Sequence, residues 1–327
     1  MSSINYLEAI VIGALQGVSE LFPVSSLGHS VLFPALVGGQ WATDLSMTGT
    51  DSPYLAVLVA MHVATALALV VFFWSDWVRL IGALLGSVRR RRVRTPDERL
   101  VWLLLLATIP VGLAGLVLEH ALRTALGRPV PAAVFLALNG VVLYAAERMR
   151  RPRPVAPVTS ADDRGDSAAP TQVIERVDPA ASTQVMDLVD PADPALAADR
   201  RLAVLSVREA VLIGATQILA LLPGISRSGI TIVGGLARGL RHDDAARFAF
   251  LLSTPVILAA GVLKVPSLFA PEYHSVLGPA LVGSLVAGLC AYVSVRFLTS
   301  YFETRTLTPF AVYCVVVGLG SLVYLAA

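Results

Sequence analysis

Two stretches of the chain hold residue types that could carry out chemistry on a phosphate group. The first, QGVSELFPVSSLGHS, places Gln16 and Glu20 four residues apart, so both lie on one face of a helix. Ser25 and Ser26 follow a proline that breaks this helix, and His29 lies about one turn into the next helical segment. The stretch therefore offers hydroxyl, carboxylate, amide and imidazole groups close together.

The second stretch, PGISRSGIT, is a glycine-bearing turn that opens a helix. Helix N-termini present free backbone N–H groups and positive partial charge, which suit a phosphate. Arg227 can add a bidentate guanidinium contact. A charged residue within a membrane costs roughly 2.5–3.5 kcal/mol, so this arginine is expected to have a function. The predicted phosphate-binding residues are Gly224, Ser226, Arg227, Ser228 and Thr231, with Ser25 from the first stretch.

Cleavage of a phosphoanhydride needs a nucleophile, neutralisation of negative charge and a proton donor. Ser26 is predicted to be the nucleophile, and His29, three residues on, to serve it as base or proton donor. Arg227 and a divalent cation would neutralise the phosphates. Glu20 would bind that cation together with Gln16, or act as the base.

Three other interpretations of these residues stay open. Arg227 could be structural and pair with Glu20. Ser25 and Ser26 could cap the helix that follows, a position where serine is strongly favoured. A cation-bound water could attack the phosphate, with Ser26 only donating a hydrogen bond. His62, His120, His242 and His274 have no comparable neighbours in the sequence and receive no role.

The composition is that of a polytopic membrane protein. Of 327 residues, 56% are hydrophobic and 15% charged, and the mean hydropathy is +0.73. A soluble domain of this length would be about one quarter charged. The net charge of +2 says little about partners, and the two cysteines, Cys290 and Cys314, are predicted to be buried thiols. The start of the chain has no pattern typical of a removable signal peptide, and nothing indicates a nucleic-acid partner.

Six apolar runs approach the ~20 residues that cross a bilayer. Arginines gather in alternate connections between these runs, which predicts those connections to be cytoplasmic and both termini to be outside. The predicted spans are 54–74, 100–118, 131–147, 244–265, 278–298 and 307–326.

An internal repeat accounts for the remaining apolar segments, 8–37 and 207–238. EAIVIGALQ in the first corresponds to EAVLIGATQ in the second, and FPVSSLGH corresponds to LPGISRSG. Both are interrupted by Pro, Gly and Ser, which predicts re-entrant hairpins. The expected fold is therefore all-α, with two inverted repeats (1–148 and 204–327), each a hairpin plus three spans. Irregular backbone is tolerated at membrane depth only where protein or a wet cavity satisfies it, so the two turns should meet at one site.

Residues 149–203 differ from the rest of the chain. They are rich in Pro, Ala, Asp and Thr and poor in large apolar residues, which predicts a disordered cytoplasmic linker. The linker contains a short duplication, TQVIERVDPA from Thr171 and TQVMDLVDPA from Thr183. Repeat slippage explains this duplication best; a docking or phosphorylation site is the alternative.

The two polar stretches resemble the signatures of the bacitracin-resistance family of undecaprenyl-diphosphate phosphatases. The family's first signature, (E/Q)xxxE followed by PVSSxGH, corresponds to QGVSELFPVSSLGH, and its second, PGxSRSxxT, corresponds to PGISRSGIT. The resemblance covers nearly the whole chain apart from the linker. Gln16 is the glutamine variant of the first motif, so the site would hold its cation with one carboxylate fewer.

This resemblance implies hydrolysis of undecaprenyl diphosphate to undecaprenyl phosphate and inorganic phosphate, which recycles the lipid carrier of cell-wall synthesis and confers bacitracin resistance. It also implies Mg²⁺ or Ca²⁺ as cofactor, a location in the bacterial plasma membrane and a site open to the outer face. A homodimer is considered as the assembly. The family's roles fall on Gln16, Glu20, Ser26, His29, Ser226, Arg227 and Thr231.

The alternative from another class is a transporter or flippase for a polyprenyl-phosphate lipid. Inverted repeats with hairpins are a transporter architecture, and a phosphate site serves either purpose. The combination of Ser26, His29 and Glu20 favours the enzyme, because a carrier needs binding groups but neither nucleophile nor acid.

Overall fold

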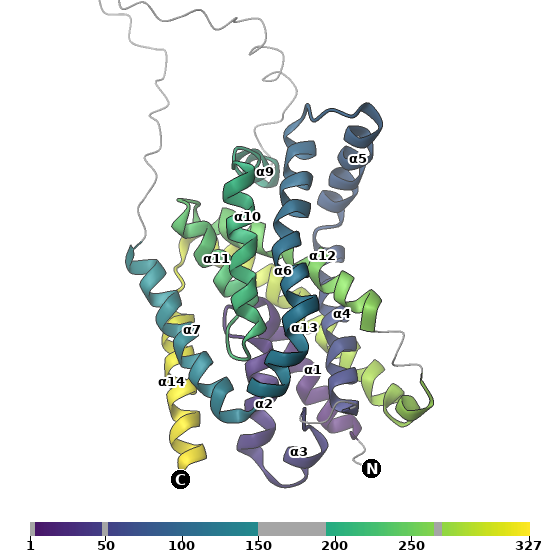
Figure 1. Cartoon of the computed structure of the whole chain (residues 1–327), viewed down its shortest axis with the longest axis vertical. Coiled ribbons are helices and arrows are strands. Elements are labelled where there is room, and N and C mark those ends of the chain that lie inside the picture. The colour runs from purple at the N-terminus through teal and green to yellow at the C-terminus, as the bar shows by residue number, and fades with distance from the viewer. Residues whose placement is uncertain (1–3, 48–51, 150–193, 265–269) are drawn as a thin grey trace, which may run out of the picture.

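The computed structural model describes residues 4–47, 52–149, 194–264 and 270–327, which form helices and turns without a β-strand (Figure 1). Six of these helices are long and apolar enough to cross a membrane, as the sequence predicted. They are α4 (Pro53–Phe72), α6 (Pro96–Leu126), α7 (Pro129–Met149), α12 (His242–Lys264), α13 (Leu277–Thr304) and α14 (Thr308–Ala326).

The two segments with the internal repeat are broken helices. The first consists of α1 (Tyr6–Leu21) and α2 (Ser26–Val37). The second consists of α10 (Val207–Ala215), the 3₁₀ turn η1 (Thr216–Leu221) and α11 (Arg227–Ala237). In the second segment, α11 packs against α10 and η1. The Thr216 hydroxyl of η1 donates to the Ile230 carbonyl of α11 at 3.1 Å. The breaks fall at the Pro-containing positions that the sequence indicated.

The repeated glutamate at the start of each segment has a structural explanation. Glu8 and Glu209 occupy the third position of α1 and α10, and each completes a capping box with Asn5 or Ser206. In α1 the Glu8 amide donates to the Asn5 side chain and the Glu8 carboxylate accepts from the Asn5 amide, both at 2.9 Å. These glutamates therefore start the helices and take no part in the site.

The repeated glycine, five residues further on, lies at equivalent helix contacts in the two halves. α1 packs along α13, and α10 packs along α6. A Cβ at Gly13 would lie 2.3 Å from the Gly283 carbonyl oxygen, and one at Gly214 would lie 2.0 Å from that of Ala107. Only glycine permits such close packing of two backbones. The two halves thus use matching interfaces, while their inverted insertion in the membrane stays a prediction.

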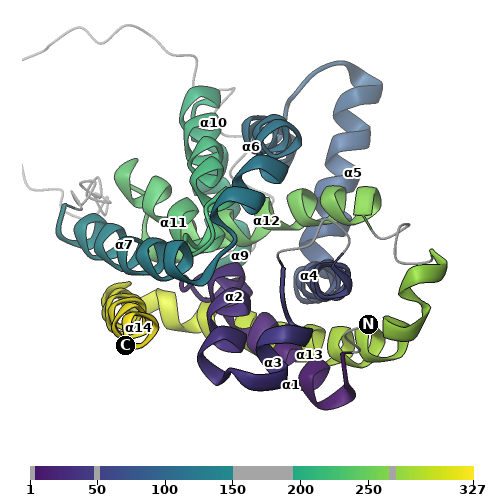
Figure 2. The same cartoon turned by 60° about the horizontal axis from the view of Figure 1, so that its bottom comes forward.

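Further elements are α3 (Gly39–Asp44), α5 (Trp74–Arg90) and η3 (Pro271–Val276). Figure 2, which brings the lower part of Figure 1 forward, shows α2 near the middle of the bundle, between α7 and α4. The polar residues of the first turn are accordingly carried into the interior of the protein.

One expectation about the linker was wrong. Residues 194–203, assigned to the disordered segment, include the helix α9 (Pro194–Ala203), which packs on α6 and α12. Asp199 of α9 is almost fully buried and accepts hydrogen bonds from Arg79 and Arg247, the latter at 2.7 Å. Paired charges of this kind allow a polar helix to be buried. The rest of the predicted linker, 150–193, with its Thr171 and Thr183 duplication, lies outside the described residues.

Candidate active site

The Glu20 carboxylate is the centre of the candidate site. Its Oε2 atom accepts from Gln16 Nε2 at 2.9 Å and from the Ser26 hydroxyl at 2.5 Å, and lies 3.2 Å from His62 Nε2. Its Oε1 atom lies 3.9 Å from Arg227. The side chain of Glu20 is only 4% exposed, so these partners largely replace water around the charge.

Ser26 and His29 have different partners in the structure. The Ser26 hydroxyl donates to Glu20, whereas His29 Nδ1 donates to the Ser25 carbonyl at 2.7 Å. His29 Nε2 lies 2.8 Å from the Tyr313 hydroxyl, and the two rings are stacked. A carbonyl oxygen only accepts, so the proton of a neutral His29 ring lies on Nδ1 and Tyr313 donates to Nε2. Of the two bases that the sequence offered for Ser26, Glu20 is the one within hydrogen-bond distance.

Two serines of the site cap helices; the capping interpretation is confirmed for Ser25 but not for Ser26, and Ser226 is a further cap. Ser25 precedes α2 and accepts from the Gly28 amide at 3.2 Å; its φ of 70° is unusual for a residue other than glycine. Ser226 precedes α11 and accepts from the Gly229 amide at 3.2 Å. Ser26, by contrast, is the first residue of α2, so its hydroxyl is free to reach Glu20.

The two turns are joined by direct contacts. Asn139 of α7 donates to the Pro23 carbonyl of the first turn and accepts from the Ser226 amide of the second, both at 3.0 Å. A Cβ on Gly28 would lie 2.9 Å from Gly224 Cα, so the turns touch at their glycines. Gly224 has a φ of 111°, which favours glycine. The expectation that the turns meet is confirmed.

The remaining predicted phosphate-binding residues surround this junction. Ser228 lies 3.1 Å from the Ser226 hydroxyl, and its own hydroxyl donates to the Phe22 carbonyl at 3.3 Å. Thr231 is fully buried and donates to the Arg227 carbonyl at 2.8 Å within its own helix. Arg227 is the first residue of α11 and its side chain is 28% exposed. This arginine is thus the cationic group of the junction that can reach a ligand.

Three residues of the site were missed by sequence reasoning: His62, Asn139 and Tyr313. They come from α4, α7 and α14, which are remote in sequence from both turns. His62 was given no role because its sequence neighbours are apolar. A polar side chain in the middle of a predicted span is the signal that identifies such residues, and His62 and Asn139 both carry it.

The residues around Glu20 fit a divalent cation. Gln16 Oε1 is buried and has no hydrogen-bond partner among the described residues, so this amide oxygen is available beside the carboxylate. Mg²⁺ and Ca²⁺ both prefer oxygen ligands. Within the described part of the chain there is no group of three or more His, Cys, Asp or Glu side chains arranged around a metal. A cation bound here would therefore need ligands beyond the protein, such as phosphate oxygens and water.

Fold and site together define a class: a polytopic α-helical membrane protein whose broken helices bring a serine, a carboxylate and an arginine together. The family model described as "Bacitracin resistance protein BacA" matches residues 9–320. Undecaprenyl-diphosphatase of Mycolicibacterium paratuberculosis is 60% identical over 323 residues, covering 99% of this chain and 98% of the relative. Undecaprenyl-diphosphatase of Mycobacterium avium is 59% identical over 325 residues, covering 99% of both. Undecaprenyl-diphosphatase 1 of Frankia casuarinae is 53% identical and 97% of each chain is covered.

The chain belongs to the bacitracin resistance protein BacA family. The resemblance recognised from the two motifs is thereby confirmed. The flippase alternative is not favoured, because the relatives carry the name of a phosphatase and Ser26 is hydrogen-bonded to a carboxylate.

Proposed function

We propose that the protein hydrolyses undecaprenyl diphosphate to undecaprenyl phosphate and inorganic phosphate, with Ser26 as nucleophile and Glu20 as its base. The observation that carries the assignment of roles is the 2.5 Å hydrogen bond from the Ser26 hydroxyl to the buried Glu20 carboxylate. A carboxylate in direct contact with a hydroxyl can remove its proton as the oxygen attacks phosphorus. Membership of the family supports the substrate.

In the first step the Ser26 oxygen attacks the terminal phosphorus and its proton passes to Glu20. A bond from Ser26 to phosphorus forms, the bond from phosphorus to the bridging oxygen breaks, and undecaprenyl phosphate leaves. Water then attacks the phosphoserine: the bond from water oxygen to phosphorus forms and the bond from Ser26 to phosphorus breaks, the proton held by Glu20 returns to the Ser26 oxygen, and the two water protons leave with inorganic phosphate. Arg227 and the N-terminal amides of α11 stabilise the negative charge on the phosphoryl oxygens.

We assign His29 and Tyr313 to the leaving-group side of the reaction, where a protonated His29 would supply the proton that the leaving group needs. The Tyr313 hydroxyl lies 2.8 Å from His29 Nε2, and the bond from Nδ1 to the Ser25 carbonyl fixes the orientation of the ring. With Glu20 assigned to the nucleophile, His29 is the remaining titratable group of the first turn for the leaving-group side. Two titratable groups with separate partners suit the separate roles of acid and base.

A divalent cation would be held by Glu20 and Gln16 Oε1. When bound, it neutralises part of the negative charge of the diphosphate. His62, 3.2 Å from Glu20 Oε2, supports the orientation of this carboxylate from α4.

The assay that tests this proposal measures phosphate release from a long-chain isoprenyl diphosphate in detergent, with and without EDTA. Ser26→Ala should lower kcat by several orders of magnitude, and single-turnover reactions with labelled substrate should trap phosphate on the wild-type protein. Loss of a single hydrogen-bond donor lowers kcat by only ~10²–10³. A Ser26→Ala enzyme within tenfold of wild type would contradict the nucleophile assignment in favour of attack by water.

We further propose that the arginine-rich connections are cytoplasmic and that the site opens to the outer face, with a homodimer as the assembly to be tested by cross-linking. Gly28, which would be the obvious cysteine position, is unsuitable because a side chain there would collide with Gly224. Exposed Gln40 and Arg92 are better positions, in a background with Cys290 replaced by serine. A membrane-impermeant thiol reagent should label Gln40→Cys in intact cells and Arg92→Cys only in inverted vesicles; the reverse pattern would overturn the orientation.

A further inference from the structure

A second polar region, distinct from the two catalytic turns, lies where α13 ends and α14 begins. A groove of about 1120 Å³ lies on the surface there. Its lining includes two arginines, hydroxyl side chains and aromatic rings: Arg296, Arg305, Ser300, Thr304, Phe297 and Tyr301. Neither the family motifs nor the proposed mechanism uses these residues.

The two arginines of this groove are not neutralised by the protein. Both are exposed, and none of the described residues places a carboxylate within ion-pair distance of either guanidinium. None of the described residues that line the groove is acidic. The hydroxyls of Ser300 and Thr304 add hydrogen-bond donors without adding charge. The groove is therefore complementary to an anion that accepts several hydrogen bonds.

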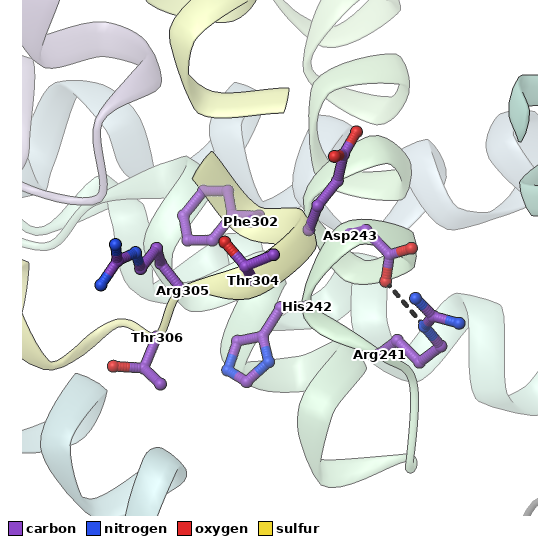
Figure 3. Close-up of a pocket in the computed structure, with 8 residues that line it drawn as sticks. Arg241, His242, Asp243, Phe302, Thr304, Arg305 and Thr306 are labelled. Atoms are coloured by element: carbon purple, nitrogen blue, oxygen red, sulfur yellow. Dashed lines mark hydrogen bonds and ion pairs between the residues drawn. The ribbon is translucent and has the colours of Figure 1, made fainter. Parts of the chain in front are cut away.

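A neighbouring cavity differs from the groove in the charges of its lining residues. It measures about 260 Å³ and is lined by side chains of both signs (Figure 3). Arg241 pairs with Asp243 at 3.1 Å, and His242 lies 2.9 Å from Glu147. In Figure 3 the Arg305 side chain extends to the opposite side of the cavity from the Arg241–Asp243 pair. Arg241 and His242 of this cavity thus have carboxylate partners, whereas Arg305, which lines both the cavity and the groove, has none within ion-pair distance among the described residues.

An apolar stripe leads along α13 into the groove. Leu281, Leu285, Leu289, Val293 and Phe297 are spaced by four residues and are all exposed. Consecutive residues at this spacing are neighbours on a helix surface, and because each step of four residues turns by about 40° beyond a full turn, the series winds gradually around α13. On a helix long and apolar enough to span the membrane, an exposed stripe of this kind faces lipid chains. The stripe and the arginines together match a molecule with an apolar chain and an anionic head.

The floor of the groove lies next to the candidate active site without being part of it. Phe297 stacks on Phe22 of the first turn, with ring centroids 5.9 Å apart, and Tyr301 contacts Phe297 at 5.6 Å. A ligand in the groove would therefore contact Phe297, the ring that stacks on Phe22 of the first turn. The groove opens on the surface of the bundle, at the point where the exposed apolar stripe of α13 reaches it.

We infer that this groove binds an anionic glycerophospholipid of the bilayer. Its phosphodiester group lies between Arg296 and Arg305 and accepts from Ser300 and Thr304, and its acyl chains follow the stripe on α13. Basic pockets between membrane-spanning helices select such head groups by charge. A neutral phospholipid offers the same chains and lacks the net negative charge, so the groove discriminates against it.

The test is native mass spectrometry of the full-length protein, purified in detergent and titrated with phosphatidylglycerol or phosphatidylcholine. Wild type should retain phosphatidylglycerol at least tenfold better than phosphatidylcholine. The Arg296→Gln/Arg305→Gln variant should lose this preference. The control Arg92→Gln/Arg238→Gln removes two exposed arginines elsewhere and should retain it. Phosphate release should be unchanged in both variants, because none of the four arginines belongs to the catalytic machinery.

A second variant removes the space and keeps the charge. Ser300→Phe introduces a bulky ring at an exposed position in the groove and should also abolish retention of phosphatidylglycerol. Unchanged thermal melting shows that each variant is folded. Equal retention of both lipids, or undiminished retention of phosphatidylglycerol in the arginine and Ser300→Phe variants, would overturn the inference. Displacement of the bound lipid by farnesyl phosphate or inorganic phosphate at equal concentration would also overturn it, because the groove would then be a product or phosphate site.

Discussion

Replacement of Glu20 by glutamine tests the central assignment of the site. The substitution keeps the size of the side chain and an oxygen that can accept from Ser26, but removes the charge and the basicity. A positioned general base contributes about 10²–10⁴ to a rate, so kcat should fall by that factor. At about 1.36 kcal/mol for each factor of ten, this equals about 3–5 kcal/mol of transition-state stabilisation. Arg227, at 3.9 Å, also loses its partner.

The decisive measurement is the double variant Ser26→Ala/Glu20→Gln. Because the Ser26 hydroxyl and Glu20 are joined by a 2.5 Å hydrogen bond, they should act as one unit. Residues that act as a unit are strongly non-additive, so the double variant should be within roughly threefold of Ser26→Ala alone. Phosphate release from a long-chain isoprenyl diphosphate in detergent gives kcat for all three variants.

Ser30 provides the matched control. It lies one helical turn after Ser26 in α2, and its hydroxyl is buried without a hydrogen-bond partner among the described residues. Ser30→Ala should therefore leave kcat within about twofold of wild type. If the losses caused by Ser26→Ala and Glu20→Gln multiply in the double variant, Glu20 does not serve Ser26, and the proposed base is wrong.

Four further predictions concern single contacts. Arg227→Lys should restore only part of the activity lost in Arg227→Ala, because an ammonium cannot reproduce the guanidinium fork; a wild-type rate in the lysine variant would refute a bidentate contact. Asn139→Leu leaves the Ser226 amide without its Asn139 partner and should lower the free energy of unfolding by about 1–3 kcal/mol, seen as a lower melting temperature, and should also lower kcat. If the melting temperature and kcat both stay unchanged, Asn139 does not bridge the two turns. His62→Gln keeps a donor towards Glu20 and should be more active than His62→Leu; equal rates would exclude the contact. Asp199→Asn removes one carboxylate partner from Arg79 and Arg247, which both keep Asp76, and should destabilise the fold in thermal melts by less than the roughly 3–5 kcal/mol of a fully broken buried pair, without changing kcat in folded material; an unchanged melt would contradict the ionic role of α9.

The sequence was sufficient for features that depend on local patterns. The spans follow from the length and hydropathy of each run, and all six were confirmed. Gln16 and Glu20 share a face because the helical period places them there, and their hydrogen bond of 2.9 Å bears this out. The meeting of the two turns was predicted from the need to satisfy interrupted backbone inside a membrane. The end of the linker was predicted incorrectly, because α9 is polar and is stabilised by Arg79 and Arg247 from other helices.

Only the tertiary structure decided which groups touch within the site. Spacing placed Ser26 and His29 on one helix face, but the turn before α2 directs Ser26 to Glu20, and α14 supplies Tyr313 as the partner of His29. His62 and Asn139 enter from α4 and α7, which have no local signal that relates them to the turns. Helical periodicity fixes which residues share a face, whereas contacts between remote helices depend on how their backbones pack. Here that packing is set by close approaches at glycines, which bring α4, α7 and α14 around the two turns.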